Sequence, residues 1–187
     1  TSAGSQVYNQ KVELGANVTL TSTGNQAITF SDDVDATFAG GQSLTVNTTG
    51  ATTFGGDVGD TFRLSFLTTN AGGTTNIGGN ITTNTSPIIN DAITLTGNST
   101  ITSNANSNIA LNNTIDGAFD LVVNTTGTTF LGTTVGGITP LNSITTNAGG
   151  TTRILGNVTT VNGQTYNDGV EIVNNATFAT TGPGTIN

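Results

Sequence analysis

Residues 44–50 read Leu-Thr-Val-Asn-Thr-Thr-Gly, and residues 121–127 repeat them as Leu-Val-Val-Asn-Thr-Thr-Gly, 77 positions later. The stretch Thr-Thr-Asn-Ala-Gly-Gly-Thr-Thr at 68–75 recurs unchanged at 145–152, with the same offset. Self-similarity at a fixed period is the signature of a repeat architecture, in which each unit buries its apolar side by stacking on its neighbours. The repeat therefore governs how the rest of the chain is interpreted.

The repeat divides one continuous segment, 1–187, into the units 1–83 and 84–160 and a partial unit, 161–187. Asp35 and Phe38 match Asp116 and Phe119 at an offset of 81, whereas Leu44 matches Leu121 at 77, so the first unit carries four extra residues between Phe38 and Leu44. The extra residues fall within 39–43, a glycine-containing stretch that we expect to form a loop.

Each unit contains short alternations of apolar and polar residues, such as Val12-Glu-Leu14 and Val18-Thr-Leu20. This alternation is typical of half-buried strands, and the abundant β-branched residues favour strands as well. Clusters of Gly and Asn separate the alternations and indicate turns. An apolar residue is also followed four positions later by Val or Ile in nine pairs: Tyr8/Val12, Phe30/Val34, Phe54/Val58, Ile77/Ile81, Ile89/Ile93, Leu111/Ile115, Leu131/Val135, Ile154/Val158 and Tyr166/Val170.

These strands are too short to pair as long hairpins, but stacking corresponding strands along one axis would bury the apolar side of every unit. The sequence therefore predicts an all-β fold, a right-handed parallel β-helix (β-solenoid). Coils of about 19 to 24 residues give about four turns per unit and about nine or ten turns in all. We expect Tyr8, Phe30, Phe54 and Tyr166 to open strands and to lie in apolar ladders along the axis. A β-sandwich is the alternative, since it also uses short alternating strands.

The composition excludes several classes of function. The chain has 42 Thr, 26 Gly and 24 Asn, and only 7% of its residues are charged, against roughly 25% in ordinary domains. The absence of Cys and His excludes disulfides, a thiol nucleophile, a Ser-His-Asp triad and the usual zinc sites. We therefore expect no enzyme and no cofactor. Three cations cannot follow a phosphate backbone, so nucleic acid is not an expected partner. The apolar runs are too short for membrane insertion.

The chain resembles the repetitive stalks of filamentous-haemagglutinin-like and autotransporter-like bacterial surface exoproteins. The resemblance covers essentially the whole chain and rests on phrases such as Gln-Val-Tyr-Asn at 6–9, Gln-Thr-Tyr-Asn at 164–167 and Gly-Asn-Val-Thr-Thr at 156–160. It implies a right-handed β-helix and an extracellular or cell-surface location. No secretion-signal region and no receptor-binding tip are recognisable, so the resemblance extends to a stalk and not to a binding specificity.

The resemblance thus implies a structural stalk or fibre segment of an adhesin or an extracellular matrix filament. Its expected partners are sister copies, end to end or side by side, and host or matrix glycans. Three alternatives stay open: a self-polymerising fibre subunit, a carbohydrate-binding or carbohydrate-cleaving β-helix, and an ice-binding protein. The last rests on the Thr-x-Thr spacing at 19–21 and 94–96.

Acidic residues provide the only candidates for a metal site. Asp32, Asp33 and Asp35 form a cluster that could bind Ca²⁺, act as the carboxylates of a polysaccharide-cleaving enzyme, or belong to a solvated loop. Asp57 and Asp60 mark a second acidic loop. In the second unit only Asp35 keeps an acidic counterpart, which favours the solvated loop.

The aromatic residues suggest a second kind of site. Phe38, Phe62 and Phe119 lie nearer to the predicted loops than to the apolar ladders. We therefore predict that these three side chains are candidates for an exposed contact.

Overall fold

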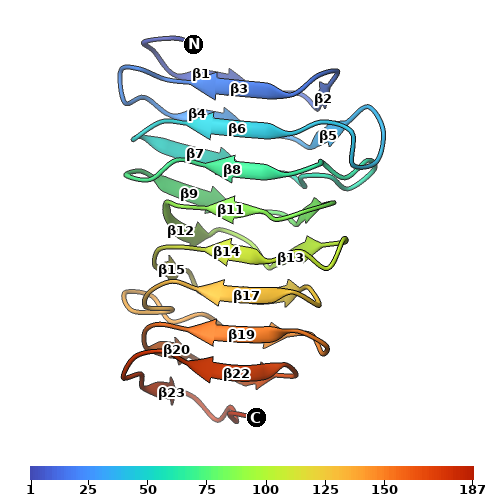
Figure 1. The fold of residues 1–187 in the computed structure, drawn as a ribbon. Helices are drawn as coiled ribbons and strands as arrows, with labels where there is room; N and C mark the ends of the chain where they lie inside the picture. Colours follow the sequence, from blue (N-terminus) through green and yellow to red (C-terminus); the bar gives the residue numbers. More distant parts are fainter.

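The structure is a computed structural model that describes all 187 residues, which form 23 short strands and no helix. The strands wind into a single rod, and all their pairings are parallel (Figure 1). The strands nearest the viewer in Figure 1 point left and those behind point right, while the chain descends from N to C. The coil is therefore right-handed, which is the usual hand for parallel crossovers. The predicted β-solenoid is confirmed, and the β-sandwich is excluded.

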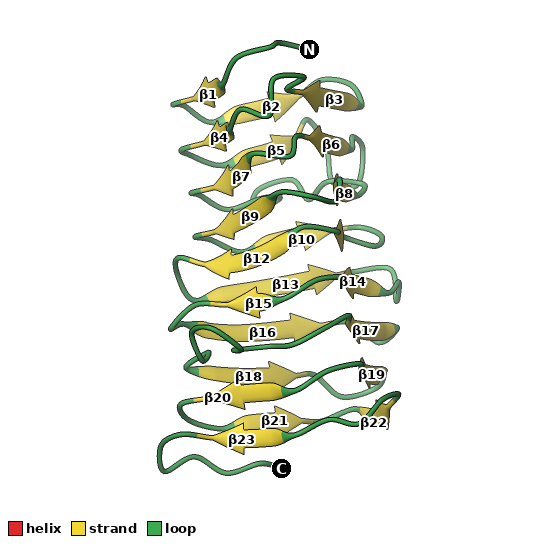
Figure 2. Ribbon diagram, turned by 90° about the vertical axis from the view of Figure 1, so that its left-hand side faces the viewer, coloured by secondary structure: helices red, strands yellow, loops and turns green.

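Each turn of the coil contributes to three faces, which the chain visits in order around the axis (Figure 2). The first face consists of β1(Gln6–Tyr8), β4(Ile28–Phe30), β7(Ala51–Phe54), β9(Thr74–Ile77), β12(Ala92–Leu95) and β15(Ile115–Asp116), and continues through Val135 to β20(Val158–Thr160) and β23(Phe178–Thr180). The second consists of β2(Val12–Leu14), β5(Val34–Ala36), Val58, β10(Ile81–Thr83), β13(Ser99–Ser103), β16(Asp120–Asn124), β18(Ser143–Thr146), β21(Gln164–Tyr166) and Ile186. The third consists of β3(Val18–Thr21), β6(Leu44–Asn47), β8(Leu67–Thr69), β11(Ile88–Ile89), β14(Ile109–Leu111), β17(Thr128–Leu131), β19(Thr151–Ile154) and β22(Gly169–Ile172).

The rod completes eight turns and begins a ninth, because the third face has eight strands and only β23 and Ile186 follow it. The expected nine or ten turns were too many. The second and third coils carry long loops, so the paired residues Val18 and Leu44 are 26 positions apart, whereas Thr68 and Ile88 are 20 apart. At about 4.8 Å between strands, eight rungs span roughly 38 Å.

The pairs spaced by four residues mark corners of the coil. Phe30 ends β4 and Val34 opens β5, and both side chains are buried. The first member of such a pair ends a strand, so the expectation that Tyr8, Phe30, Phe54 and Tyr166 open strands was wrong. Three residues between the two members suffice to turn the chain from one face to the next while both side chains stay inside.

The interior is one continuous apolar cluster of 27 buried residues. Its first coils contain a stack of parallel rings on the first face, with 5.1 Å between the centroids of Tyr8 and Phe30 and 5.4 Å between Phe30 and Phe54. Further down, Tyr166 meets Phe178 edge to face at 5.9 Å. Identical registers in successive coils let like side chains stack, so the core extends without a break along the rod.

The sequence repeat does not coincide with a whole number of turns. Leu44 lies in β6 on the third face, and its counterpart Leu121 lies in β16 on the second. Likewise Ile81 lies in β10 on the second face, and Val158 lies in β20 on the first. From Leu44 to Leu121 the chain advances eleven strand positions, which is four turns less one face.

Equivalent residues of the two units therefore lie on neighbouring faces, a third of a turn apart. Corresponding strands of the two units stack in parallel along one axis, as expected, but they lie in different columns. The columns of the core instead combine different positions of the repeat. This is tolerated because the inward positions of all three faces accept the same set of Val, Ile, Leu and Thr side chains.

Candidate functional site

Residues 59–64 form a loop that folds over the outside of β5, and we call it the first flap. It begins at Gly59, whose φ of +76° favours glycine, and a Cβ there would collide with the carbonyl oxygen of Thr82. It ends at Leu64, which is fully buried and forms a bridge with Thr83 of the next coil. Both ends of the first flap are therefore held in place.

The middle of the first flap is held by Asp35. One carboxylate oxygen accepts hydrogen bonds from the backbone N–H groups of Thr61 and Phe62, both at 3.2 Å. The other oxygen lies 2.8 Å from Nζ of Lys11, and the hydrogen bond to this carboxylate raises the pKa of Lys11. The Asp35 side chain is only 1% exposed, so it anchors the flap from beneath.

Residues 136–141 form a second flap of the same construction, which begins at a glycine with φ of +69° and ends at a fully buried leucine. Asp116 accepts hydrogen bonds from the backbone N–H groups of Ile138 at 2.8 Å and Thr139 at 3.0 Å. Asp116 is the counterpart of Asp35. The one acidic residue that both units keep is thus the residue that anchors the flap.

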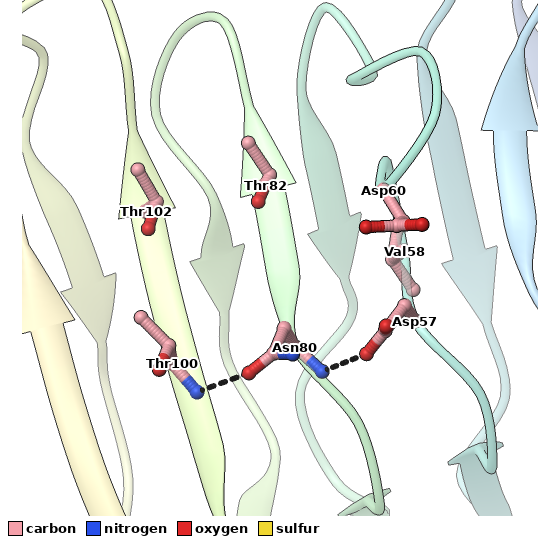
Figure 3. A pocket seen from close by; sticks show the side chains of 7 residues that line it. All are labelled: Asp57, Val58, Asp60, Asn80, Thr82, Thr100 and Thr102. Atoms are coloured by element: carbon pink, nitrogen blue, oxygen red, sulfur yellow. Dashed lines mark hydrogen bonds between the residues drawn. The ribbon is translucent and has the colours of Figure 1, made fainter.

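A shallow groove of about 260 Å³ lies on the outer side of the second face, bordered by the first flap. Figure 3 shows two carboxylates on one side of it and three threonine side chains on the other. Its lining consists of Asp57, Val58, Asp60, Asn80, Thr82, Thr100 and Thr102. Carboxylates, an amide and hydroxyls are groups that hydrogen-bond the hydroxyls of a polar ligand.

A chain of side-chain acceptors connects successive coils beside this groove. Asp33 accepts a hydrogen bond from the N–H of Asp57 at 2.8 Å, and Asp57 accepts one from the N–H of Asn80 at 2.6 Å. Asn80 in turn accepts one from the N–H of Thr100 at 2.9 Å (Figure 3). These groups satisfy backbone donors at the corner, where the strand ladder is interrupted.

The three calcium candidates are not brought together. Asp32 accepts a hydrogen bond from the N–H of Asp33 at 2.9 Å, Asp33 binds the backbone of Asp57, and Asp35 lies beneath the first flap. No group of three or more acidic side chains in the structure is arranged to hold a metal ion. The contacts of Asp33 and Asp35 join their coil to the next one, whereas Asp32 bonds only to its neighbour in the chain.

The three phenylalanines proposed for an exposed contact differ in their surroundings. Phe38 and Phe62 are 59% and 43% exposed, whereas Phe119 is half-buried and packs against the core. Phe66, which the sequence did not single out, is exposed as well. Leu67, the next residue, opens β8 and is fully buried, so the alternation of strand side chains is the signal that directs Phe66 outward.

Two of the three cations of the chain lie at the first flap. Lys11 forms an ion pair with Asp35 beneath the flap, and its Nζ donates a hydrogen bond to the hydroxyl of Thr61 in the flap at 3.5 Å. Arg63 lies within the flap, and its Nε donates a hydrogen bond to Asn84 at 3.3 Å. The third cation, Arg153, pairs with a glutamate on the third face at 2.7 Å.

Two further carboxylates, 77 residues apart in the sequence, bind backbone and side-chain donors inside the coil. Asp91 is fully buried and accepts hydrogen bonds from the N–H of Gly73 at 2.8 Å and the hydroxyl of Thr75 at 3.0 Å. Asp168 repeats both contacts with Gly150 and Thr152, at 2.8 and 3.2 Å. Burial raises the pKa of Asp91.

The Thr-x-Thr stretches behind the ice-binding alternative lie on different faces. Residues 19–21 belong to β3 on the third face, whereas Thr94 belongs to β12 on the first. They do not form one array. The structure contains no helix long and apolar enough to cross a membrane.

Comparisons with protein-family models, with curated proteins and with solved structures found no significant match to this chain. The class that the geometry defines is a right-handed β-solenoid with carboxylate-anchored flaps. Function is therefore argued from the fold and from these contacts.

Proposed function

We propose that this chain is a structural stalk or fibre segment of a secreted or surface-anchored bacterial adhesin or extracellular matrix filament. The observation that supports the proposal is the single apolar core, which extends through all eight turns without a gap. A continuous core and parallel ladders make a rod in which each coil is held by the coils above and below. Such a rod can hold a distant group at a set distance from a surface.

Hydrogen bonds between neighbouring coils also support the proposal. Carboxylate and amide side chains bind backbone N–H groups of neighbouring coils at the corners, where strand pairing lapses. The chain has no cysteine, so the coils are joined without disulfides. On this proposal the abundance of threonine follows from the strand-rich surface, because β-branched residues favour strands. The scarcity of charged residues follows from the same surface, on which threonine occupies most outward positions.

The stalk proposal is tested by measuring whether the ends keep a constant separation. Gly4 and Gly169 have open space around an added Cβ, so a cysteine at each carries a spin label without disturbing the coil. Because the natural chain has no cysteine, labelling is confined to these two sites. A stiff rod gives one narrow distance distribution in pulsed electron-spin measurements, whereas a broad distribution contradicts the proposal.

A self-polymerising fibre is a second candidate, favoured by the first coil. Its strands leave one edge unpaired, and an apolar groove of about 190 Å³ opens between Tyr8, Val12 and Leu20. At the other end, Val170 and Ile172 of β22 are exposed. Unpaired parallel edges can add strands from another chain. Electron microscopy at high protein concentration distinguishes long filaments from single rods.

Carbohydrate binding is a third candidate, favoured by the polar groove beside the first flap. The equivalent surface of the second unit lacks these two carboxylates, because Thr134 and Gly137 stand in place of Asp57 and Asp60. We therefore expect glycan binding only beside the first flap. A glycan array probed with the natural chain and with the double variant Asp57→Asn, Asp60→Asn tests this candidate. Binding that the double variant loses supports it, and an array without signal contradicts it.

A further inference from the structure

Glycine follows an Asp or Asn residue at three places in the chain: Asp116-Gly117, Asn162-Gly163 and Asp168-Gly169. In such a pair the backbone nitrogen of the glycine can attack the preceding side chain, because glycine has no side chain of its own to obstruct the approach. We propose that Asn162-Gly163 is a site of spontaneous deamidation, and that the fold leaves this pair open to the reaction while it protects the other two.

The reaction consumes only water. The backbone nitrogen of Gly163 loses its proton and attacks Cγ of Asn162, the new N–C bond closes a five-membered succinimide ring, and Nδ2 leaves as ammonia. Water then opens the ring at either carbonyl carbon and gives aspartate or isoaspartate at position 162. A neutral amide thereby becomes a carboxylate, which adds one negative charge to the net charge of −8.

The side chains of the two aspartate–glycine pairs are occupied by structural contacts. Asp116 accepts two hydrogen bonds from the second flap, and the N–H of Gly117 donates to the carbonyl oxygen of Thr139 at 3.2 Å. Asp168 is buried and accepts hydrogen bonds from the N–H of Gly150 and from a threonine hydroxyl. Ring closure at either pair would break these bonds, so both pairs are protected.

Asn162, in contrast, lies in the short loop 161–163 that joins β20 to β21, and its side chain is exposed. The N–H of Gly163 donates to no acceptor of the chain. The space beside Gly163 is open as well, because an added Cβ would approach only the carbonyl oxygen of Thr185, at 3.4 Å. The attacking nitrogen is therefore free, and water reaches the amide that it attacks.

A buried hydroxyl favours the loss of the proton. Oγ1 of Thr160 donates a hydrogen bond to the carbonyl oxygen of Asn162 at 2.7 Å. This oxygen and the nitrogen of Gly163 belong to the same peptide group, so resonance places part of the negative charge of the deprotonated group on the oxygen. A hydrogen bond to a charged acceptor is stronger than one to a neutral acceptor, so Thr160 stabilises the reactive form.

The product would alter a contact between coils. Nδ2 of Asn162 donates a hydrogen bond to Oδ1 of Asn142 at 2.7 Å, and Nδ2 of Asn142 donates one to Oδ1 of Asp120 at 2.6 Å. These bonds connect three successive coils. After deamidation the donor at position 162 is replaced by a carboxylate oxygen that faces another acceptor. The contact becomes repulsive, so we expect the stacking of these coils to loosen as the protein ages.

Mass spectrometry of aged protein tests the proposal. Trypsin cleaves after Arg153, and residues 154–187 contain no Lys or Arg, so a single peptide carries the site. After incubation of the folded chain at mildly alkaline pH, this peptide is expected to gain the mass of an amide-to-acid conversion, which fragment spectra place at position 162. The rate should increase with pH, because the deprotonated nitrogen is the nucleophile. Labelling by an isoaspartyl methyltransferase detects the isoaspartate.

Gly163→Ala is the matched variant, because the position has room for a Cβ. It should slow the reaction by about tenfold, since the Cβ hinders the attacking nitrogen. Thr160→Val should slow it roughly fivefold, the effect of losing one net hydrogen bond. Asn162→Asp reproduces the charge of the product and should accelerate hydrogen exchange of the Asn142 amide. Circular dichroism verifies that the three variants remain folded.

Two results would overturn the proposal. In the first, the peptide keeps its mass in the folded chain while the urea-unfolded chain deamidates, which would mean that the fold protects Asn162. In the second, the other asparagines of residues 154–187 react as fast as Asn162, or Gly163→Ala leaves the rate unchanged. None of these outcomes depends on the spin-label test of the stalk proposal.

Discussion

The carboxylate of Asp91 lies 3.0 Å from the hydroxyl of Thr75, sixteen residues earlier in the chain and one coil above. The same carboxylate accepts a hydrogen bond from the N–H of Gly73 at 2.8 Å. Asp91 is completely buried, so the two donors are its main compensation for the loss of water. Two neutral donors compensate only in part for burial of the carboxylate, so the negative charge of Asp91 lowers the stability of the folded chain.

Asp91→Asn should therefore stabilise the rod at neutral pH. An amide can accept from Gly73 N–H and donate to the Thr75 hydroxyl, so both contacts remain while the buried charge is removed. We expect the free energy of unfolding at pH 7 to rise by about 1 kcal/mol in urea titrations. Asp91→Ala is the control, and it should lower the free energy of unfolding by about 2 kcal/mol because both donors lose their partner. Destabilisation by the asparagine comparable to that by the alanine would show that the negative charge itself is needed.

The stability of the natural chain should respond to acid through the same residue. Burial raises the pKa of folded Asp91 above the ordinary value of 3.8, so the folded state binds this proton more readily than the unfolded state. The resulting stabilisation is complete below pH 3.8 and is lost as the pH rises through the higher folded pKa. On acidification from pH 7 towards pH 4, the natural chain should gain stability relative to Asp91→Asn. A constant difference between the two proteins across this range would contradict the buried-charge argument.

The two flap anchors should have separable local effects. Asp35→Ala removes the buried acceptor of two backbone N–H groups, so it should cost about 2 kcal/mol of stability. Hydrogen exchange of the Thr61 and Phe62 amides should accelerate, while the Ile138 and Thr139 amides keep their protection. Asp116→Ala should produce the converse pattern. Equal acceleration in both flaps would mean that the flaps are not held independently.

The ring stack of the first face should respond to truncation far more than the exposed rings do. Phe30 lies between Tyr8 and Phe54, and it is 1% exposed. Phe30→Ala should cost about 4 kcal/mol, the value typical of a buried aromatic residue. Phe62→Ala should change the unfolding free energy by less than about 0.5 kcal/mol, since its ring is partly in solvent. Chemical denaturation of the two variants at equal concentration provides the comparison.

Much of the fold could be predicted because it depends on local pattern. Alternating apolar residues indicated strands, the 77-residue repeat indicated stacking, and pairs such as Phe30 and Val34 bracketed the corners. The candidate site could be predicted only in part. Asp35 was identified within the acidic cluster of residues 32–35, as a calcium-ligand candidate and not as the anchor of a flap. Its partners are N–H groups of Thr61 and Phe62, and no local pattern indicates which backbone donors lie over a given carboxylate.

The sequence by itself determined that this chain is a right-handed β-solenoid with an apolar axis and a polar, threonine-rich surface. Only the tertiary structure decided how the repeat is phased on the coil. Leu44 and Leu121 are equivalent in sequence and lie on different faces, because the unit contains eleven strand positions while each turn accommodates three. The number of positions depends on how many residues each corner and flap takes up when the coils pack. That packing also decides the directions in which Phe62 and Ile138 point.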